Sequence, residues 1–93
     1  MDDNALEIHV SLDNEFGLHA RPAAVLAKEA QKFSSDIRLS FGGKEVDAKS
    51  ILDILTLAAT NGSPLRIKAS GDDAPDAVKR MKELITGRFE EKR

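Results

Sequence analysis

Four stretches of this chain alternate apolar and polar residues, and a period of two is the pattern of a β-strand that buries one face. The strands are predicted over residues 6–12, 37–41, around Val46, and over 64–70. Gly42 and Gly43 offer the positive backbone angles of a tight hairpin between the second and third strands. Because every strand has a single apolar face, we expect an antiparallel sheet with helices packed on one side.

Three helices are predicted around these strands. The first begins after His19, a short second helix begins after Ser50 and ends near Asn61-Gly62, and the third begins after Asp73 and ends at Gly87. The Ser50 and Asp73 side chains are expected to cap their helices. Apolar residues at amphipathic spacing occur in the first helix at Ala23, Leu26, Ala27, Ala30 and Phe33, and in the third at Ala74, Ala77, Val78, Met81, Leu84 and Ile85. The element order is therefore βαββαβα, and the class is α+β.

Length and composition limit the possible functions. The 93 residues suffice for one modest core, so we expect a single domain over residues 1–93 with a frayed tail at 89–93. A net charge of −2 gives no basic surface for nucleic acid or an anionic membrane. The absence of cysteine excludes disulfides, thiolate metal sites and cysteine nucleophiles. No apolar run could span a bilayer and the start is acidic, so we expect a soluble cytoplasmic protein without membrane insertion or a signal peptide.

The turn before the first helix contains the residues best suited to chemistry. Gly17 permits unusual backbone angles, and His19 then lies at or near the N-cap. The unpaired N–H groups and the dipole of a helix start attract an anion, and the Arg21 guanidinium adds donors suited to phosphate oxygens. Pro22 in the first turn loses nothing by lacking an N–H. Because an imidazole ordinarily has a pKa of about 6.5, a ring nitrogen can act as a nucleophile near neutral pH.

Residues 17–23, Gly-Leu-His-Ala-Arg-Pro-Ala, strongly resemble the active-centre motif of the HPr family, the histidine-containing phosphocarriers of bacterial phosphotransferase systems. Residues 49–52, Lys-Ser-Ile-Leu, resemble the regulatory serine segment of that family, and residues 71–74, Gly-Asp-Asp-Ala, resemble the entry to its last helix. The resemblance covers nearly the whole chain after the first few residues. It implies an open-faced β-sandwich, in which a four-stranded antiparallel sheet of order 1-4-2-3 has three helices on one face.

The same resemblance implies a function. A phosphocarrier accepts a phosphoryl group from phosphorylated enzyme I on Nδ1 of His19 and passes it to an enzyme IIA protein, with Arg21 offsetting the phosphoryl charge. The chain would then take part in phosphotransfer without being a free-standing catalyst. No cofactor or metal in the carrier is implied, and we expect a monomer.

Regulation and docking are also implied by the resemblance. Ser50 matches the serine that an HPr kinase/phosphorylase modifies in some organisms, and a phosphate there would oppose partner binding. The residues after Ser50 are apolar over more of the helix surface than one core contact needs, so part of that surface should be exposed. The docking residues implied by the resemblance are Phe16, Ala20, Ala24, Ile51, Leu52 and Leu55.

Alternatives remain open from the sequence. His19 could be only a capping or surface histidine, and Arg21 only a surface cation. Phe16 departs from the commonest HPr pattern, which has a small polar residue there. An apolar residue at this position also occurs in nitrogen-branch (NPr) relatives, which suggests a regulatory module whose phosphorylation state partners read. A small ligand-binding βαββαβ domain, such as an amino-acid sensor, could share the periodicities. His9 is predicted to be solvated without a role, and two histidines without cysteine do not make a convincing zinc cluster.

Overall fold

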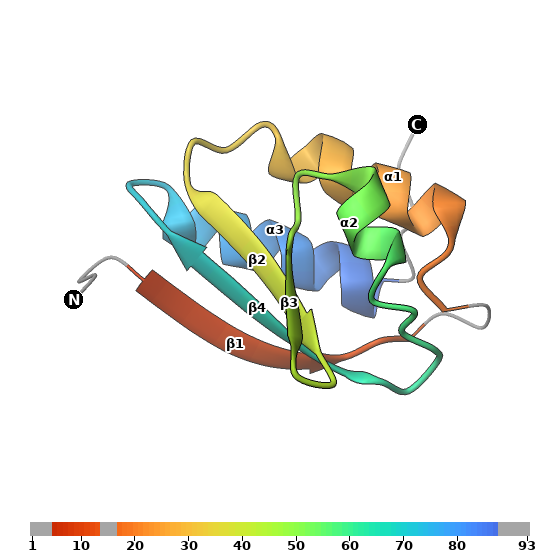
Figure 1. The fold of residues 1–93 in the computed structure, drawn as a ribbon. Coiled ribbons are helices and arrows are strands. Elements are labelled where there is room, and N and C mark those ends of the chain that lie inside the picture. The colour runs from red at the N-terminus through yellow and green to blue at the C-terminus, as the bar shows by residue number, and fades with distance from the viewer. Residues whose placement is uncertain (1–4, 14–16, 88–93) are drawn as a thin grey trace.

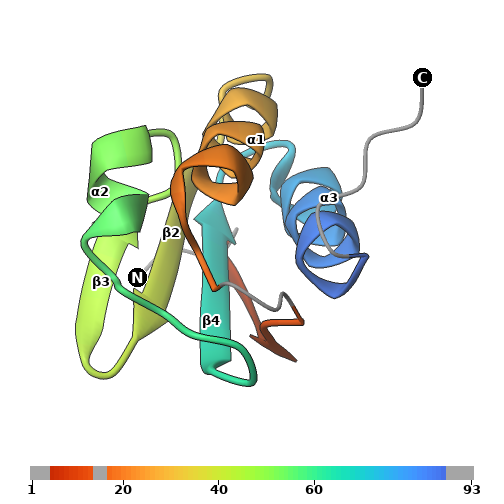
Figure 2. The same ribbon diagram turned by 90° about the vertical axis from the view of Figure 1, so that its right-hand side faces the viewer.

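The computed structural model describes residues 5–13 and 17–87. It contains seven elements in the predicted order, and they run β1 (Ala5–Ser11), α1 (Ala20–Ala30), β2 (Asp36–Phe41), β3 (Lys44–Asp47), α2 (Ile51–Leu55), β4 (Pro64–Ser70) and α3 (Ala74–Thr86). The strands form one antiparallel sheet in the order β1-β4-β2-β3, with all three helices on one side (Figures 1 and 2). The implied open-faced sandwich is therefore confirmed. Phe16 and the tail at 89–93 lie outside the described residues.

The strand register brings the predicted apolar positions onto one face. Ile8 pairs with Ile67, Ile67 pairs with Leu39, and Leu39 pairs with Val46, which makes a single apolar row across all four strands. Strand β1 is less buried than predicted, because it has a neighbour on one side only and Leu6 remains 39% exposed. The core therefore lies over the centre of the sheet.

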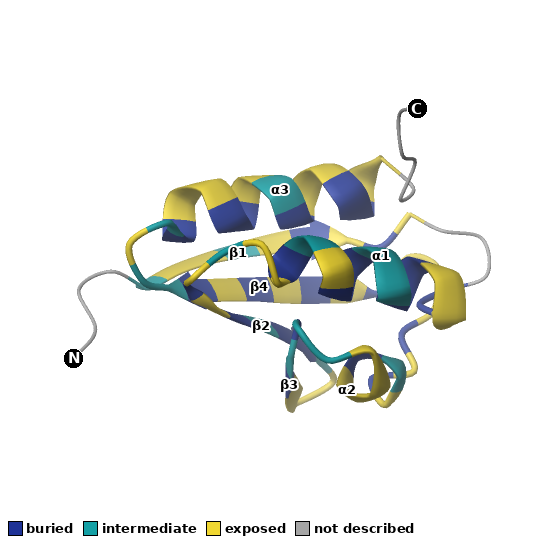
Figure 3. Cartoon of the chain, turned by 90° about the horizontal axis from the view of Figure 1, so that it is seen from above, coloured by how far each residue is buried: buried dark blue, intermediate teal, exposed yellow. Residues whose placement is uncertain are grey.

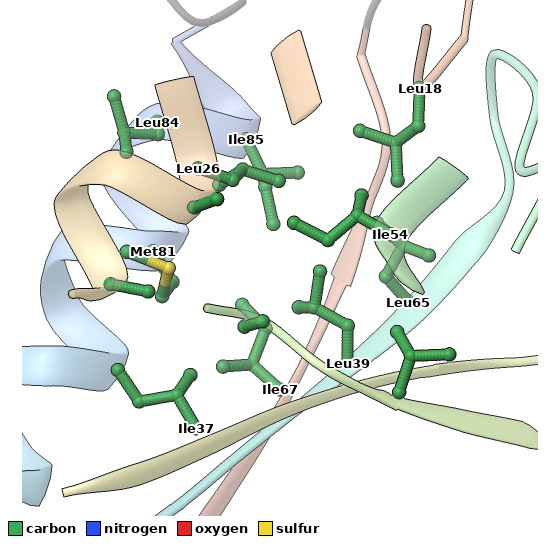
Figure 4. Packing of buried hydrophobic residues seen from close by; sticks show 14 of the residues in the cluster. Leu18, Leu26, Ile37, Leu39, Ile54, Leu65, Ile67, Met81, Leu84 and Ile85 are labelled. Atoms are coloured by element: carbon green, nitrogen blue, oxygen red, sulfur yellow. The ribbon is translucent and has the colours of Figure 1, made fainter. Parts of the chain in front are cut away.

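The helices cover this apolar face with the stripes predicted from their spacing. In Figure 3 the buried positions of α1 and α3 recur along one side of each helix. Figure 4 shows Leu26 of α1, Ile54 of α2 and Met81 of α3 converging over the sheet, and all three side chains are fully buried. Phe33 is only half-buried, because α1 ends at Ala30 and Phe33 lies in the turn beyond it. None of the described helices combines the length and apolar character needed to cross a membrane.

Helix α2 is much shorter than predicted. It ends at Leu55, whereas the sequence pattern placed its end near Asn61-Gly62. Tight turns follow, in which Leu57 N–H donates to the Ile54 carbonyl at 3.1 Å, and Ala58 then takes a positive φ of 53°. The apolar residues of this segment cover too wide an arc for one helix to bury. Ending the helix early lets Ile54, Leu57 and Ala59 all reach the core.

Asp73 is the N-cap residue of α3, but its side chain does not cap that helix as predicted. Its carboxylate instead accepts hydrogen bonds from the N–H groups of Ser34 and Ser35, both at 2.9 Å, and from Ser35 Oγ at 2.5 Å. The carboxylate thereby joins the turn before β2 to the turn before α3, which lie far apart in the sequence. These two turns approach each other closely, since a Cβ added to Gly71 would lie 2.6 Å from Ser35 Oγ.

This network predicts an acid-sensitive contribution to stability. The Ser35 hydroxyl, together with the N–H groups of Ser34 and Ser35, lowers the pKa of Asp73 from 3.8 to about 2. Because the folded-state pKa is the lower one, the contribution is complete above 3.8 and is lost as pH falls towards 2. Asp73→Asn should therefore be less stable than wild type at neutral pH, and the difference should shrink across this window.

Urea denaturation at a series of pH values measures this effect. The variant should still lose stability in acid as other carboxylates are protonated. One of these is Glu29, whose pKa is lowered mainly by its hydrogen bond with Lys32. A constant difference between wild type and Asp73→Asn from neutral pH down to pH 2 would contradict the assignment.

Candidate functional site

The segment that leads into α1 is held by its backbone. Gly17 has φ +75°, and Leu18 N–H donates to the Ala59 carbonyl at 2.9 Å. His19 N–H donates to the Gly17 carbonyl at 3.1 Å. The Leu18 side chain is buried, while His19 is exposed. The segment is thus anchored through Leu18 and presents His19 at the surface.

His19 is the N-cap residue of α1, as predicted. Its backbone is extended, and its carbonyl accepts a hydrogen bond from Ala23 N–H at 2.9 Å. The imidazole itself makes no cap hydrogen bond to the helix. The interpretation of His19 as a capping side chain is therefore not supported, since its backbone alone does the capping.

The first turn of α1 favours an anion beside His19. It contains no acidic residue. Ala20 and Arg21 are its two N–H donors, because Pro22 has none and Ala23 already bonds His19. No acceptor for these two N–H groups and no ion pair of the exposed Arg21 occur in the part of the chain that the structure describes. The helix dipole and the guanidinium both add positive potential here.

Five of the residues that the HPr resemblance implies for docking lie on α1 and α2, and we call them the docking patch: Ala20, Ala24, Ile51, Leu52 and Leu55. Leu52 is 76% exposed and Ile51 is 41% exposed. Helices α1 and α2 pack side by side (Figure 2), and they run in opposite directions. The direction follows from two hydrogen bonds, since Leu18 before α1 bonds Ala59 after α2, and Gln31 after α1 bonds the Lys49 carbonyl before α2. The end of α2 therefore lies near His19.

Ser50 is the N-cap residue of α2, as predicted. Its hydroxyl accepts a hydrogen bond from Asp53 N–H at 3.2 Å, while its own N–H donates to the Asp47 carbonyl. The predicted side-chain cap is therefore formed. Lys49 Nζ donates to the Phe33 carbonyl at 2.7 Å, which holds Ser50 beside the C-terminal end of α1, whereas His19 lies at its N-terminal end. Because α1 has 11 residues, its two ends, and so Ser50 and His19, are roughly 16 Å apart.

The backbone contact of Ala59 with the active segment was not predicted. Every residue has a backbone carbonyl, so the type of residue at position 59 does not indicate this contact. The glycine at position 17 was the only partial indication of it in the sequence. A Cβ on Gly17 would lie 2.5 Å from the Ala59 oxygen.

His9 is exposed on the sheet face opposite the helices, 3.5 Å from Glu7, as expected for a solvated residue. In the described residues no cluster of potential metal ligands is found.

Comparison with known proteins decides the family. Residues 6–87 match a family model described as PTS HPr component phosphorylation site. The phosphocarrier protein HPr of Xylella fastidiosa (strain Temecula1) is 41% identical over 86 residues, which cover 92% of this chain and 97% of that protein. The chain belongs to the HPr family. This relative is an HPr protein and does not favour the nitrogen-branch or amino-acid-sensor alternatives.

Solved HPr structures share the fold. HPr-C-His from Thermoanaerobacter tengcongensis has a TM-score of 0.88 and 40% identity, covering 95% of this chain and 99% of that one. An HPr dimer from the same organism has a TM-score of 0.74 and 41% identity, covering 88% and 94%. Because an HPr relative can dimerise, the monomer expected here stays a prediction.

Proposed function

We propose that His19 is the acceptor residue of this phosphotransferase-system phosphocarrier. Its Nδ1 accepts a phosphoryl group from phosphorylated enzyme I, and the protein passes the group to an enzyme IIA protein. The observation that carries the proposal is an exposed histidine at the start of α1 whose imidazole does not cap the helix. We expect the transfer to take place in the cytoplasm.

The chemistry needs only a lone pair and an environment that tolerates negative charge. The unprotonated ring nitrogen attacks phosphorus, a bond forms between them, and the bond from phosphorus to the donor breaks with its electron pair going to the donor. The N–H groups of Ala20 and Arg21 and the Arg21 guanidinium then offset the charge of the phosphoryl oxygens. The carrier itself contributes the placement of His19 and this positive potential.

Transfer onward requires that the phosphoryl group is not held too strongly. The missing N–H of Pro22 and the bonded N–H of Ala23 leave two donors in the first turn, where a longer run could hold an anion more tightly. The exposure of His19 also leaves the phosphoryl group accessible to a second protein. Reversible exchange with weakly bound partners is the behaviour that this geometry supports.

Incubation with phosphoenolpyruvate, enzyme I and Mg²⁺ tests the proposal. The protein should gain one acid-labile phosphate, which peptide mapping places on His19, and should lose it when an enzyme IIA protein is added. Acid-stable phosphate, or phosphate that enzyme IIA cannot accept, would refute the carrier role.

We further propose that the docking patch receives enzyme I and enzyme IIA. An apolar surface beside a positively charged site suits transient protein docking. Leu52 contributes the most exposed large side chain of the patch, so its area is available to a partner. Phe16 remains a predicted member outside the described residues.

Leu52→Ser is expected to weaken enzyme I binding about tenfold, because one leucine buried at an interface contributes about 1.5 kcal/mol. Titration calorimetry measures the affinity, and urea denaturation should show almost unchanged stability. Leu6→Ser is the matched control, since Leu6 is also exposed but lies on the edge strand β1. Equal affinities of both variants for enzyme I would exclude Leu52 from the interface.

We also propose Ser50 as a regulatory phosphorylation site for an HPr kinase/phosphorylase. A phosphate there adds about two negative charges directly before Ile51 and Leu52, within the proposed docking surface. Incubation with ATP and such a kinase tests this. Acid-stable phosphate on Ser50 together with slower phosphorylation of His19 supports the proposal, and phosphate on another residue refutes it.

A further inference from the structure

Ala58 has a backbone conformation that its own side chain does not explain. It is the one non-glycine residue in the described ranges 5–13 and 17–87 with a positive φ, at 53°. L-residues disfavour this left-handed region. The Ala58 side chain is exposed, so burial of its methyl group does not offset the strain. Interactions of the neighbouring backbone must therefore maintain the conformation of Ala58.

These interactions are made by the next residue, Ala59. Ala59 is buried, and its carbonyl accepts the N–H of Leu18 at 2.9 Å. The same oxygen packs against Gly17, where an added Cβ would lie only 2.5 Å from it and 3.1 Å from Thr60 Cα. The Ala59 carbonyl, in the peptide unit that follows that residue, is therefore in direct contact with both residues that directly precede His19.

The loop that begins at Ala58 also bonds to Leu12, at the other end of the connection from β1 to α1. Gly62 N–H donates to the Leu12 carbonyl at 2.8 Å, and Leu12 N–H donates to the Ser63 carbonyl at 2.9 Å. Within the loop, Thr60 N–H donates to Ser63 Oγ at 3.0 Å. Figure 1 shows this loop, which follows α2, beside the end of β1 and the start of α1. It therefore fixes the chain on both sides of the connection from β1 to His19.

We propose that Ala58 is a positioning residue for His19. Its left-handed backbone directs the Ala59 carbonyl at Leu18 N–H, and this bond sets the direction in which residues 17–19 enter α1. The orientation of the imidazole towards an incoming phosphoryl group then depends on a residue outside both the docking patch and the first turn of α1. This inference rests on the proposed function of His19 as the phosphoryl acceptor.

Ala58→Val provides the main test. Valine is disfavoured at positive φ, so the backbone at residue 58 should leave this conformation, which displaces residue 59 and withdraws the Ala59 carbonyl from Leu18. With phosphorylated enzyme I, the transfer rate at saturation should fall about tenfold while KM changes less than about twofold, since the docking patch is intact. The Leu18 amide should exchange with solvent about tenfold faster, and the His19 ring resonances should shift.

Two further variants separate positioning from lost stability. Ala58→Gly adopts positive φ without strain and should keep the wild-type rate. Gly42→Val places the same residue type at φ +61° in the distant β2–β3 hairpin, where a Cβ meets nothing within 4 Å. It should lower the melting temperature as Ala58→Val does, yet transfer phosphate at the wild-type rate.

Several outcomes would overturn the inference. They are a wild-type transfer rate for Ala58→Val, an equal loss for Gly42→Val, or a loss for Ala58→Gly. If Ala58→Val does not fold, an ester in place of the Leu18 amide, made by semisynthesis, removes the same hydrogen bond, and a wild-type rate there refutes the inference. Should wild type accept no phosphate on His19, the proposed function fails, whereas unchanged Leu18 exchange in Ala58→Val rejects the positioning role itself.

Discussion

His19→Gln should abolish enzyme I-dependent phosphorylation of this protein. Glutamine keeps a polar side chain of similar length at the N-cap but has no basic nitrogen to attack phosphorus. The fold should be preserved, because the imidazole makes no cap hydrogen bond and the capping carbonyl belongs to the backbone. We expect the free energy of unfolding to change by less than about 0.5 kcal/mol, as for other exposed positions. Radiolabelled phosphoenolpyruvate and urea denaturation measure the two quantities.

The second histidine of the chain supplies the matched control. His9 is exposed like His19 but lies on the sheet face away from the helices, paired with Arg66 across β1 and β4. His9→Gln should therefore accept phosphate at the wild-type rate. Acid-labile phosphate on His19→Gln, or its loss in His9→Gln, would move the acceptor away from the start of α1.

The comparison of sequence and structure shows which features residue patterns encode. The stripe of α3 was predicted residue by residue, and that of α1 at every position except Phe33, because an amphipathic helix over a sheet must bury every third or fourth position. The order 1-4-2-3 was not predictable from the patterns, since alternation fixes which face of a strand is buried but not which strand is its neighbour. That order came from the resemblance to HPr.

The errors have physical reasons. Helix α2 was predicted too long because apolar residues continue to Ala59, although Leu57 and Ala59 reach the core from the turns after Leu55, where Ala58 takes a positive φ. Asp73 was predicted to cap α3, and Ser35, 38 residues earlier in the turn before β2, could not be foreseen as its partner. Ser35 competes successfully because it offers both an N–H and a hydroxyl.

The site was predictable where side chains carry it. His19, Arg21 and Pro22 lie within the four positions 19–22, just before a stretch rich in alanine, and this pattern places them at the start of a helix. The support under that turn was not predictable, because it consists of the Ala59 carbonyl and a backbone hydrogen bond to Leu18. A sequence therefore indicates the reacting group more readily than the frame that orients it.

Gly17→Ala should show how strongly that frame constrains the protein. The substitution adds the strain of φ +75° and places Cβ 2.5 Å from the Ala59 oxygen, a backbone atom that cannot move aside alone. Relief requires the loss of the Leu18–Ala59 hydrogen bond, so we expect a total destabilisation of about 2 to 4 kcal/mol. The melting temperature should fall by roughly 10 to 20 °C for a domain of this size.

Gly43→Ala separates the two causes. Gly43 has a similar φ of +83°, but its added Cβ would meet nothing within 4 Å. It carries only the conformational cost, about 1 kcal/mol, and a decrease of about 5 °C in melting temperature. Thermal unfolding of both variants measures the difference, which is the contribution of the contact between Gly17 and Ala59. Equal melting temperatures would mean that the loop after Ala58 yields to the added methyl group, and Gly17→Ala would then still transfer phosphate at the wild-type rate.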